Sequence, residues 1–331
     1  LFSLSALPVL LLGASLLARF TREAIQWEVG WIVGVISLVH LIPWIGVNAN
    51  VDRAISRFEM ILKDGSRLSI HALGASYDEL RSEYERRGNM YRALKAAENS
   101  LEANPEHTRY LANVIRLLQK TGQRKQVQQV LEEVVKKTPD FGGAYLQLAR
   151  FYREEGKVEA ADASVRKALR LDPNSGDAHA ELGAVLKELG NFPEAIMFLE
   201  KAVRLDGRDA GVYNLLGTVY GTLGRIEEAT SSFRKALKLD PGSSEGWSNL
   251  GVATYRAGRL DESKLAFQRS LKLDPENPTA KNGLGVFLQR QGRTAAALRL
   301  FREALVIDPN DLNTLLNLAS ASYESGNLKE S

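Results

Sequence analysis

Glycine recurs along this chain at a fixed interval of 34 residues, and this interval restricts the possible fold more than any other feature of the sequence. The series comprises Gly88, Gly122, Gly156, Gly190, Gly224, Gly258, Gly292 and Gly326. Proline keeps the same interval at Pro105, Pro139, Pro173, Pro241, Pro275 and Pro309, with Gly207 in the place where proline is missing. A repeat of this length predicts small structural units that stack on one another, rather than a globule with one central core.

The two markers within each period predict two helices per unit. Glycine permits the positive φ that ends a first helix, here called helix A. Proline ends the second helix, helix B, because it lacks an amide donor and its ring clashes with the preceding turn. The phrases before proline, such as FRKALKLDPGS from Phe233 and FQRSLKLDPEN from Phe267, have the apolar spacing of an amphipathic helix. The sequence therefore predicts an all-α stack.

This pattern resembles the tetratricopeptide repeat (TPR), a helix–turn–helix unit of 34 residues that stacks into a superhelical solenoid. With proline at position 32, the resemblance implies seven complete units and a partial eighth over residues 312–331. The complete units are 74–107, 108–141, 142–175, 176–209, 210–243, 244–277 and 278–311. Residues 48–73 are interpreted as a linker with a degenerate half-repeat helix, in which Ala54, Phe58 and Ile61 have the spacing of a helix B.

Small and large residues alternate within the units, as close packing of helices requires. Position 8 is glycine in four units (Gly183, Gly217, Gly251 and Gly285), and position 20 is alanine in five (Ala93, Ala161, Ala195, Ala229 and Ala297). Position 24 is phenylalanine at Phe233, Phe267 and Phe301. The first two units depart from this pattern with Arg81, Ile115 and Val127. Their bulk is expected to widen or rotate the local helix crossing.

Two long apolar stretches precede the repeats. Residues 1–18 and 29–47 carry no charged side chain, and each approaches the length of about 20 residues that crosses a bilayer as a helix. Trp27, Trp31 and Trp44 lie at the ends of the second stretch, where interfacial aromatic residues are expected. We therefore predict a two-helix transmembrane hairpin over residues 1–47 that contacts lipid, in preference to a signal peptide over the first stretch.

His40 lies near the middle of the second stretch. It is interpreted as a neutral imidazole in a helix contact, with a proton relay as the alternative. The chain is thus expected to be an integral membrane protein. The basic residues near the hairpin, taken alone, would place the repeats in the cytoplasm, but a long folded domain weakens that rule. We favour the extracytoplasmic side, periplasm or lumen, which the absence of cysteine also suits.

Composition and motifs point away from catalysis. The chain has no cysteine, its four histidines do not lie at metal-ligand spacing, and its net charge of +3 has no concentrated basic stretch of the kind that binds nucleic acid. Neither a nucleophile elbow nor a metalloprotease or phosphate-loop motif is present. Residues 1–331 are therefore predicted to form no enzyme, to need no metal or cofactor, and to bind protein rather than nucleic acid.

The resemblance implies a concave groove lined by the A helices, at positions 2, 5, 6, 9, 12 and 13 of each unit. The candidate groove residues are Asn113, Arg116, Gln147, Arg150, Arg153, Asn214, Asn249, Tyr255, Asn282 and Asn317. Side-chain amides donate and accept hydrogen bonds, so a row of them can hold the backbone of an extended peptide. This row resembles the asparagine ladder of some superhelical members, whereas the carboxylate clamp of the chaperone-binding members is not present as a set.

We therefore expect a membrane-anchored TPR scaffold that binds a protein or peptide in its groove, within a multi-protein membrane assembly. One alternative is the C-terminal solenoid of a polytopic membrane glycosyltransferase, whose catalytic part would lie upstream of Leu1. The junction HLIPWIGVNANVDRAISRFEMIL is reminiscent of that arrangement. A structural subunit of a membrane complex is a third interpretation.

Overall fold

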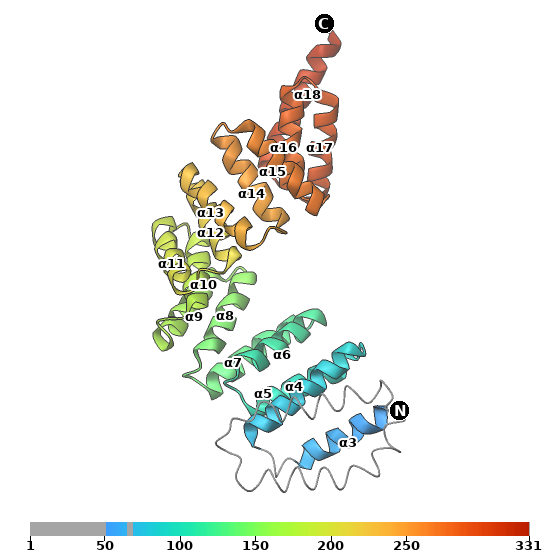
Figure 1. The fold of residues 1–331 in the computed structure, drawn as a ribbon, viewed down its shortest axis with the longest axis vertical. Helices are drawn as coiled ribbons and strands as arrows, with labels where there is room; N and C mark the ends of the chain where they lie inside the picture. Colours follow the sequence, from blue (N-terminus) through green and yellow to red (C-terminus); the bar gives the residue numbers. More distant parts are fainter. Residues whose placement is uncertain (1–50, 65–68, 331) are drawn as a thin grey trace. The chain divides into compact units, whose positions relative to one another are not determined.

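The computed structural model describes residues 51–64 and 69–330, and within these ranges it is helical with short connections and has no strand (Figure 1). The helices are α3 (Val51–Asp64), α4 (Ile70–Arg86), α5 (Met90–Ala103), α6 (Thr108–Lys120), α7 (Arg124–Lys137), α8 (Gly142–Glu154), α9 (Val158–Leu171), α10 (Gly176–Glu188), α11 (Phe192–Leu205), α12 (Ala210–Thr222), α13 (Ile226–Leu239), α14 (Ser244–Arg256), α15 (Leu260–Leu273), α16 (Pro278–Arg290), α17 (Thr294–Ile307) and α18 (Leu312–Glu330). From α4 onward, even-numbered helices are A helices and odd-numbered helices are B helices. The predicted all-α repeat fold is confirmed.

The chain divides into two compact units, Leu1–Ala144 (unit 1) and Tyr145–Ser331 (unit 2). In unit 1, α3 contacts α4, and α4 to α7 pack successively. In unit 2, each B helix from α11 to α17 packs between the A helix of its own repeat and the A helix of the next. Within each unit, neighbouring repeats therefore bury their apolar faces against one another, as expected for a stacked array.

The predicted transmembrane hairpin at residues 1–47 lies outside the described residues, as does His40. Among the helices that the structure does describe, none combines the length and apolar character needed to cross a membrane.

Glycine ends the A helices as predicted. The seven glycines from Gly88 to Gly292 have φ between 70° and 77°. In a typical case, the Gly190 N–H donates to the Lys187 carbonyl at 3.0 Å, and the Asn191 N–H donates to the Leu186 carbonyl at 2.9 Å. These bonds satisfy carbonyls that the end of the helix would leave unpaired. Gly326 differs from the prediction because α18 continues through it to Glu330.

Aspartate, rather than proline alone, shapes the turn after helix B. The side chains of Asp172, Asp206, Asp240, Asp274 and Asp308 each accept a hydrogen bond from the backbone N–H two residues later, at 3.0–3.3 Å. Such a bond holds the chain in a tight turn. The residue at position 34 then begins the next A helix, as when Ser243 accepts a hydrogen bond from the Gly246 N–H at 2.9 Å. The repeated phrase therefore encodes a helix end, a turn and a helix start.

Glycine at position 8 gives room to the large side chain at position 24 of the same repeat. A Cβ atom placed on Gly251 would lie 2.6 Å from the Phe267 ring, and one on Gly183 would lie 2.5 Å from Leu199. Phe267 also meets Gly283 of the next repeat, where a Cβ would lie 2.4 Å from the ring. Phe267 is only 2% exposed. The glycines thus allow the helices to approach closely on both sides of one ring.

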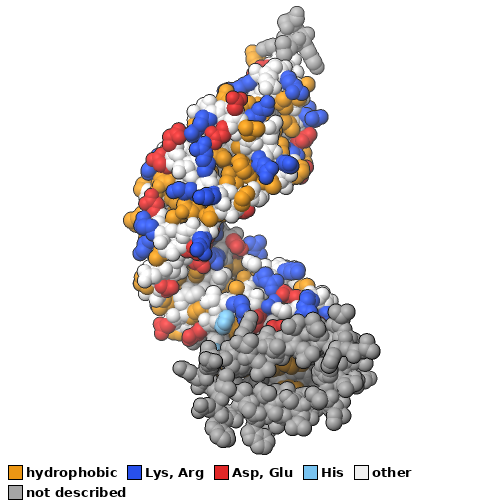
Figure 2. Space-filling view, viewed as in Figure 1, with side chains coloured by type: hydrophobic (Ala, Val, Ile, Leu, Met, Phe, Trp, Pro, Cys, Tyr) orange, Lys and Arg blue, Asp and Glu red, His pale blue; other side chains and the backbone are white. Residues whose placement is uncertain are grey.

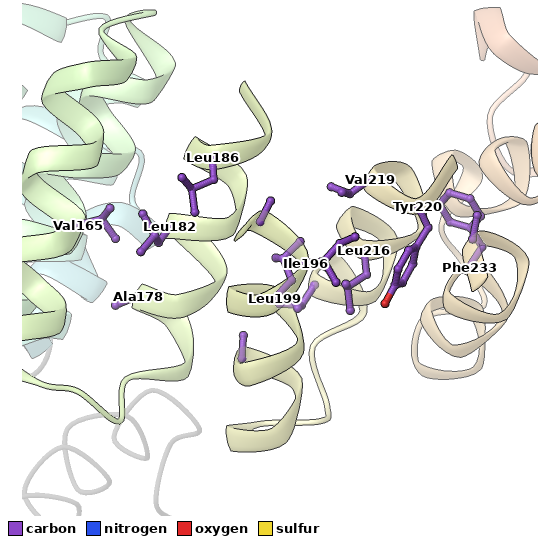
Figure 3. Close-up of a cluster of buried hydrophobic side chains, with 14 of the residues drawn as sticks. Val165, Ala178, Leu182, Leu186, Ile196, Leu199, Leu216, Val219, Tyr220 and Phe233 are labelled. Carbon is purple, nitrogen blue, oxygen red and sulfur yellow. The ribbon is translucent and has the colours of Figure 1, made fainter. Parts of the chain in front are cut away.

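The same arrangement forms the central core of unit 2 (Figure 3). Leu182 and Leu186 of α10 meet Ile196 and Leu199 of α11, and the cluster continues to Phe233 of α13. The predicted small position 20 is filled by alanines that are fully buried, at Ala93, Ala161, Ala195, Ala229 and Ala297. In unit 2, Ala195 and Ala229 belong to the same apolar cluster as Leu182 and Phe233, which joins successive repeats.

The start of the repeat region departs from two expectations. In α3, the buried residues are Ile55 and Leu62, whereas Ile61 is 48% exposed, so the predicted stripe containing Ile61 was misplaced by one residue. Helix α4 begins at Ile70, four residues before the predicted unit start, because Ser69 accepts a hydrogen bond from the Ala72 N–H at 3.2 Å and caps the helix earlier.

Replacing Gly251 by alanine should destabilise the chain by about 1–3 kcal/mol, because the new methyl group would overlap the Phe267 ring. The matched control is Gly221→Ala in α12, where a Cβ meets only the Ala229 Cβ at 3.9 Å. The control should be neutral or stabilising, since alanine favours helix over glycine. Chemical denaturation followed by circular dichroism would measure both. Equal effects of the two substitutions would contradict this packing.

His179 should make folding sensitive to acid. It is 3% exposed, its Nε2 lies 3.0 Å from the Pro173 carbonyl oxygen, and it stacks on Phe198. Burial lowers the pKa of His179 below its ordinary value of 6.5. The contribution of His179 to stability is therefore fully present above pH 6.5. It is lost as the pH falls below that value, because the unfolded chain then binds a proton at His179 more readily than the folded chain does.

The equivalent position of two other repeats is tyrosine, at Tyr145 and Tyr213. We therefore expect the His179→Tyr variant to lose less melting temperature than the wild type between neutral and mildly acidic pH. His107, whose pKa burial also lowers, is retained in both proteins and serves as the internal reference. An unchanged pH dependence would show that His179 titrates normally.

Candidate functional site

The predicted groove residues lie on the exposed side of the A helices, here called the A-helix face and defined by positions 2, 5, 6, 9, 12 and 13 of each repeat. In unit 2 the successive A helices α10, α12, α14, α16 and α18 contact one another directly. Polar side chains of one A helix therefore reach those of the next. The A-helix face of unit 2 runs from α8 to α18, and that of unit 1 comprises α4 and α6.

The predicted asparagines bridge adjacent repeats. Asn249 donates through Nδ2 to Asn214 Oδ1 at 3.1 Å, and Asn317 donates to Asn282 Oδ1 at 2.9 Å. Asn214 in turn donates to Glu245 at 3.0 Å. The two bonds between asparagines join position 6 of one repeat to position 5 of the repeat before it. The bond from Asn214 to Glu245 joins position 5 of one repeat to position 2 of the next. The amides are thus fixed in orientation by the stack, and Asn249 and Asn317 keep their own carbonyl oxygens for other partners.

The predicted basic residues of unit 2 are neutralised within the chain. Arg153 donates to Glu181 at 2.6 Å and to Glu188 at 3.3 Å, while Arg150 lies 3.6 Å from Glu181. The Glu181 side chain is only 7% exposed. Burial opposes the charge on Arg153, but the hydrogen bonds and charges of Glu181 and Glu188 raise the pKa of Arg153. The cluster joins α8 to α10 and presents little net charge.

The A-helix face of unit 1 holds a similar network. Asn113 donates to Asp78 at 2.8 Å, and Arg116 pairs with Glu85 at 2.8 Å. Arg81, which was expected to widen the helix crossing, is buried instead between Asp78 and Glu85, at 2.8 and 2.5 Å. Burial alone would raise the pKa of Glu85, but Arg116 and then Arg81 hold it below its usual value. Ion pairing thus satisfies the charge of the buried Arg81 side chain.

Between α14 and α16, the contacts across the A-helix face are aromatic, whereas those between α8 and α10 are ion pairs. The Tyr255 and Phe287 rings meet edge to face with centroids 5.7 Å apart, and the Arg290 guanidinium lies over the Tyr255 ring at 5.1 Å. Arg256 donates to the Gly221 carbonyl at 3.2 Å. Gln147, the remaining predicted residue, is half-buried on α8. Sequence reasoning selected Tyr255 but missed Phe287 and Arg290.

A single sequence offset relates many of the residues that bridge adjacent A helices. Residues 35 positions apart meet in Asn113–Asp78, Asn249–Asn214, Asn317–Asn282, Arg153–Glu188, Gln289–Glu324 and Arg256–Gly221. The offset is one repeat plus one residue, which reflects the stagger between adjacent A helices. A search of the sequence for complementary residues at this offset finds these six bridges, whereas Asn214–Glu245 and Arg116–Glu85 lie 31 residues apart and Arg153–Glu181 lies 28 apart.

A surface pocket of about 310 Å³ lies among α11, α12 and α13, away from the predicted residues. Its lining includes Tyr213, Tyr220, Glu200 and Lys235. Tyr220 donates to Glu200 at 2.8 Å, and burial followed by this hydrogen bond raises the pKa of Tyr220 to about 12. Lys235 lies over the Tyr213 ring at 5.7 Å. The polar groups of the pocket are thus engaged with one another. Within the described ranges, no cluster of side chains is suited to hold a metal ion.

Comparison with protein families matches two tetratricopeptide repeat models, over residues 69–245 and 255–311. The first match alone covers more than half of the chain, and the chain belongs to the tetratricopeptide repeat family. Comparison with curated protein sequences gives no match.

Solved structures share this fold. The structure of the APC/C hetero-tetramer Cut9–Hcn1 is similar with a TM-score of 0.62 and 21% identity, over 82% of this chain and 52% of that chain. A tetratricopeptide repeat protein from Parabacteroides merdae is similar with a TM-score of 0.57 and 14% identity, over 75% of this chain and 98% of that chain. The Pseudomonas aeruginosa pilF structure matches at 27% identity with a TM-score of 0.46, over 56% of this chain and 91% of that chain. At this level of identity, the first two similarities establish the fold alone.

Arg153→Met should destabilise the chain by about 1–3 kcal/mol, because Glu181 would remain buried with only Arg150 nearby. Adding Glu181→Gln should recover part of the loss, since a neutral amide needs no counter-charge. Arg170→Met on the exposed surface of α9 is the control and should change stability by less than about 0.5 kcal/mol. Denaturant titration of the wild type, Arg153→Met, Glu181→Gln, the double variant and the control measures the coupling, and additive effects would show that the two residues do not interact.

Proposed function

We propose that this chain is a membrane-anchored TPR scaffold. Residues 1–47 hold the repeats at a bilayer on its extracytoplasmic side, and the A-helix face of unit 2 binds an extended segment of a partner protein within a membrane assembly. Membership of the TPR family supports a protein-interaction role rather than catalysis.

The observation that carries the binding proposal is the composition of the A-helix face in unit 2. Thr218, Val252 and Val286 occupy the same position of successive repeats and are half-buried, and Val286 also packs against the core cluster of Ala297, Phe301 and Ala321. They alternate with the amide pairs of Asn249 and Asn317, which are held in place by the stack. A row of apolar patches beside oriented amides suits an extended peptide, since its backbone needs hydrogen-bonding partners and its side chains need apolar contact.

The anchoring proposal rests on sequence. Two uncharged stretches within residues 1–47 are separated by a short charged connection, and tryptophans lie at both ends of the second stretch. The repeats follow directly after α3, which contacts α4. This placement would hold the first repeat close to the membrane surface and leave the later repeats accessible to a partner.

Photo-crosslinking can test the binding surface. A photoreactive phenylalanine analogue at Val252 or Val286 should form adducts of discrete mass in native membranes. The controls are Leu265 and Val306 on the B helices, which are 66% and 83% exposed and therefore more accessible. Adducts that form equally at the control positions would contradict a specific role for the A-helix face.

Membrane extraction and protease protection test the anchor. The full chain should resist alkaline extraction from membranes, whereas a chain that begins at residue 48 should be released. Protease added to intact vesicles of known orientation should digest the repeats only from the extracytoplasmic side. Release of the full chain by alkaline extraction would contradict the anchor, and digestion from the cytoplasmic side would contradict the proposed orientation.

A further inference from the structure

The A-helix face of unit 2 changes its electrostatic character along its length. On α8, Arg150 and Arg153 are matched by Glu181 and Glu188 of α10. On α14 and α16, Arg256 and Arg290 occupy the same repeat position, 34 residues apart, and both are exposed. Neither forms an ion pair with any residue that the structure describes; their recorded contacts are a carbonyl oxygen and a tyrosine ring. Two guanidinium groups on this face are therefore without a counter-charge.

The nearby carboxylates are already engaged. On the neighbouring A helix α18, Glu324 accepts a hydrogen bond from Gln289 at 2.8 Å, and on α14 Glu245 lies at the opposite end of the helix from Arg256, where it accepts a hydrogen bond from Asn214. Acidic and basic side chains are interspersed over the visible surface of unit 2 (Figure 2), but on the adjacent A helices α14 and α16 neither Arg256 nor Arg290 is paired with a carboxylate that the structure describes. A carboxylate of a partner molecule could therefore form with Arg256 and Arg290 the kind of ion pair that Arg150 and Arg153 form with Glu181 and Glu188.

The aromatic pair lies beside these cations. Tyr255 and Phe287 are half-buried and meet edge to face, and Arg290 covers the Tyr255 ring. The contact with the ring orients the Arg290 guanidinium while its N–H groups keep their capacity to donate. Arg256 is oriented by its bond to the Gly221 carbonyl. Guanidinium groups held in this way favour carboxylates, which they can bind through two parallel hydrogen bonds.

We infer that the A-helix face across α14 and α16 selects an acidic segment of a partner protein, whose carboxylates bind Arg256 and Arg290 and whose apolar side chains contact Tyr255 and Phe287. This inference rests on the proposed function and specifies the chemistry of the partner. Charge complementarity is its basis, because Arg150 and Arg153 on the same face near the start of unit 2 find their carboxylates within the chain, whereas Arg256 and Arg290 find none among the described residues.

Fluorescence anisotropy of the full chain with a short labelled peptide of alternating glutamate and valine tests the inference. Two peptides with glutamine or lysine in place of glutamate are the matched ligands. We expect the glutamate peptide to bind more tightly than both, and Arg256→Glu/Arg290→Glu to weaken its binding about tenfold or more. Arg256→Gln/Arg290→Gln, which removes charge without adding repulsion, should give an intermediate loss with unchanged circular dichroism.

The control is Arg269→Glu/Arg302→Glu, which makes the same charge change at two exposed arginines of α15 and α17 that form no ion pair with described residues. It should alter affinity less than about twofold. Equal affinity of the glutamate and glutamine peptides, or equal losses in the two double variants, would overturn the inference. So would binding to anionic phospholipid vesicles without binding to any peptide. Crosslinking at Val252 and Val286 that persists without a glutamate preference would overturn the acidic selectivity alone and leave the proposed function standing.

Discussion

The contact between a bare glycine backbone and a large side chain is the constraint on which the rest of this structure depends. Gly251 and Gly283 belong to neighbouring repeats, yet both lie against the ring of Phe267. One side chain therefore fixes the distance between helices A and B of its own repeat and the distance to the next A helix. Because repeats in such an array contact only their neighbours, this local contact sets the helix spacing on both sides of α15.

Close approach of the A helices has a chemical consequence. It brings residues 35 positions apart within hydrogen-bonding distance, so that amides and ion pairs bridge successive repeats. The bridges use part of the polar capacity that the sequence offers for binding. On α8 and α10 the arginines form ion pairs with glutamates of the same chain, whereas the arginines of α14 and α16 form no ion pair with a described residue. The A-helix face is therefore not uniform, and its capacity to bind an external acidic group is concentrated in the later repeats.

A partner that lies along the A-helix face would contact several repeats at once. Since the stability of a repeat array is close to a sum of units and of interfaces between neighbours, such a partner would couple repeats that otherwise interact only pairwise. The oriented amides reduce the conformational entropy that binding would otherwise cost, because Asn214 and Asn282 are already held by neighbouring side chains. This preorganisation is consistent with a scaffold role.

The sequence by itself determined the repeat length, the two helices per unit, the glycine turns and the buried alanines, because these follow from backbone conformation and local spacing. It also located the A-helix residues, but it did not reveal what they contact. Only the tertiary structure decided that Arg153 is neutralised by Glu181, that Asn249 is bound to Asn214, and that Arg256 and Arg290 are left unmatched among the described residues. It also decided that Ile61 is exposed and that α18 continues through Gly326. The physical reason is that such contacts depend on the stagger between adjacent helices, which is not encoded within a single repeat.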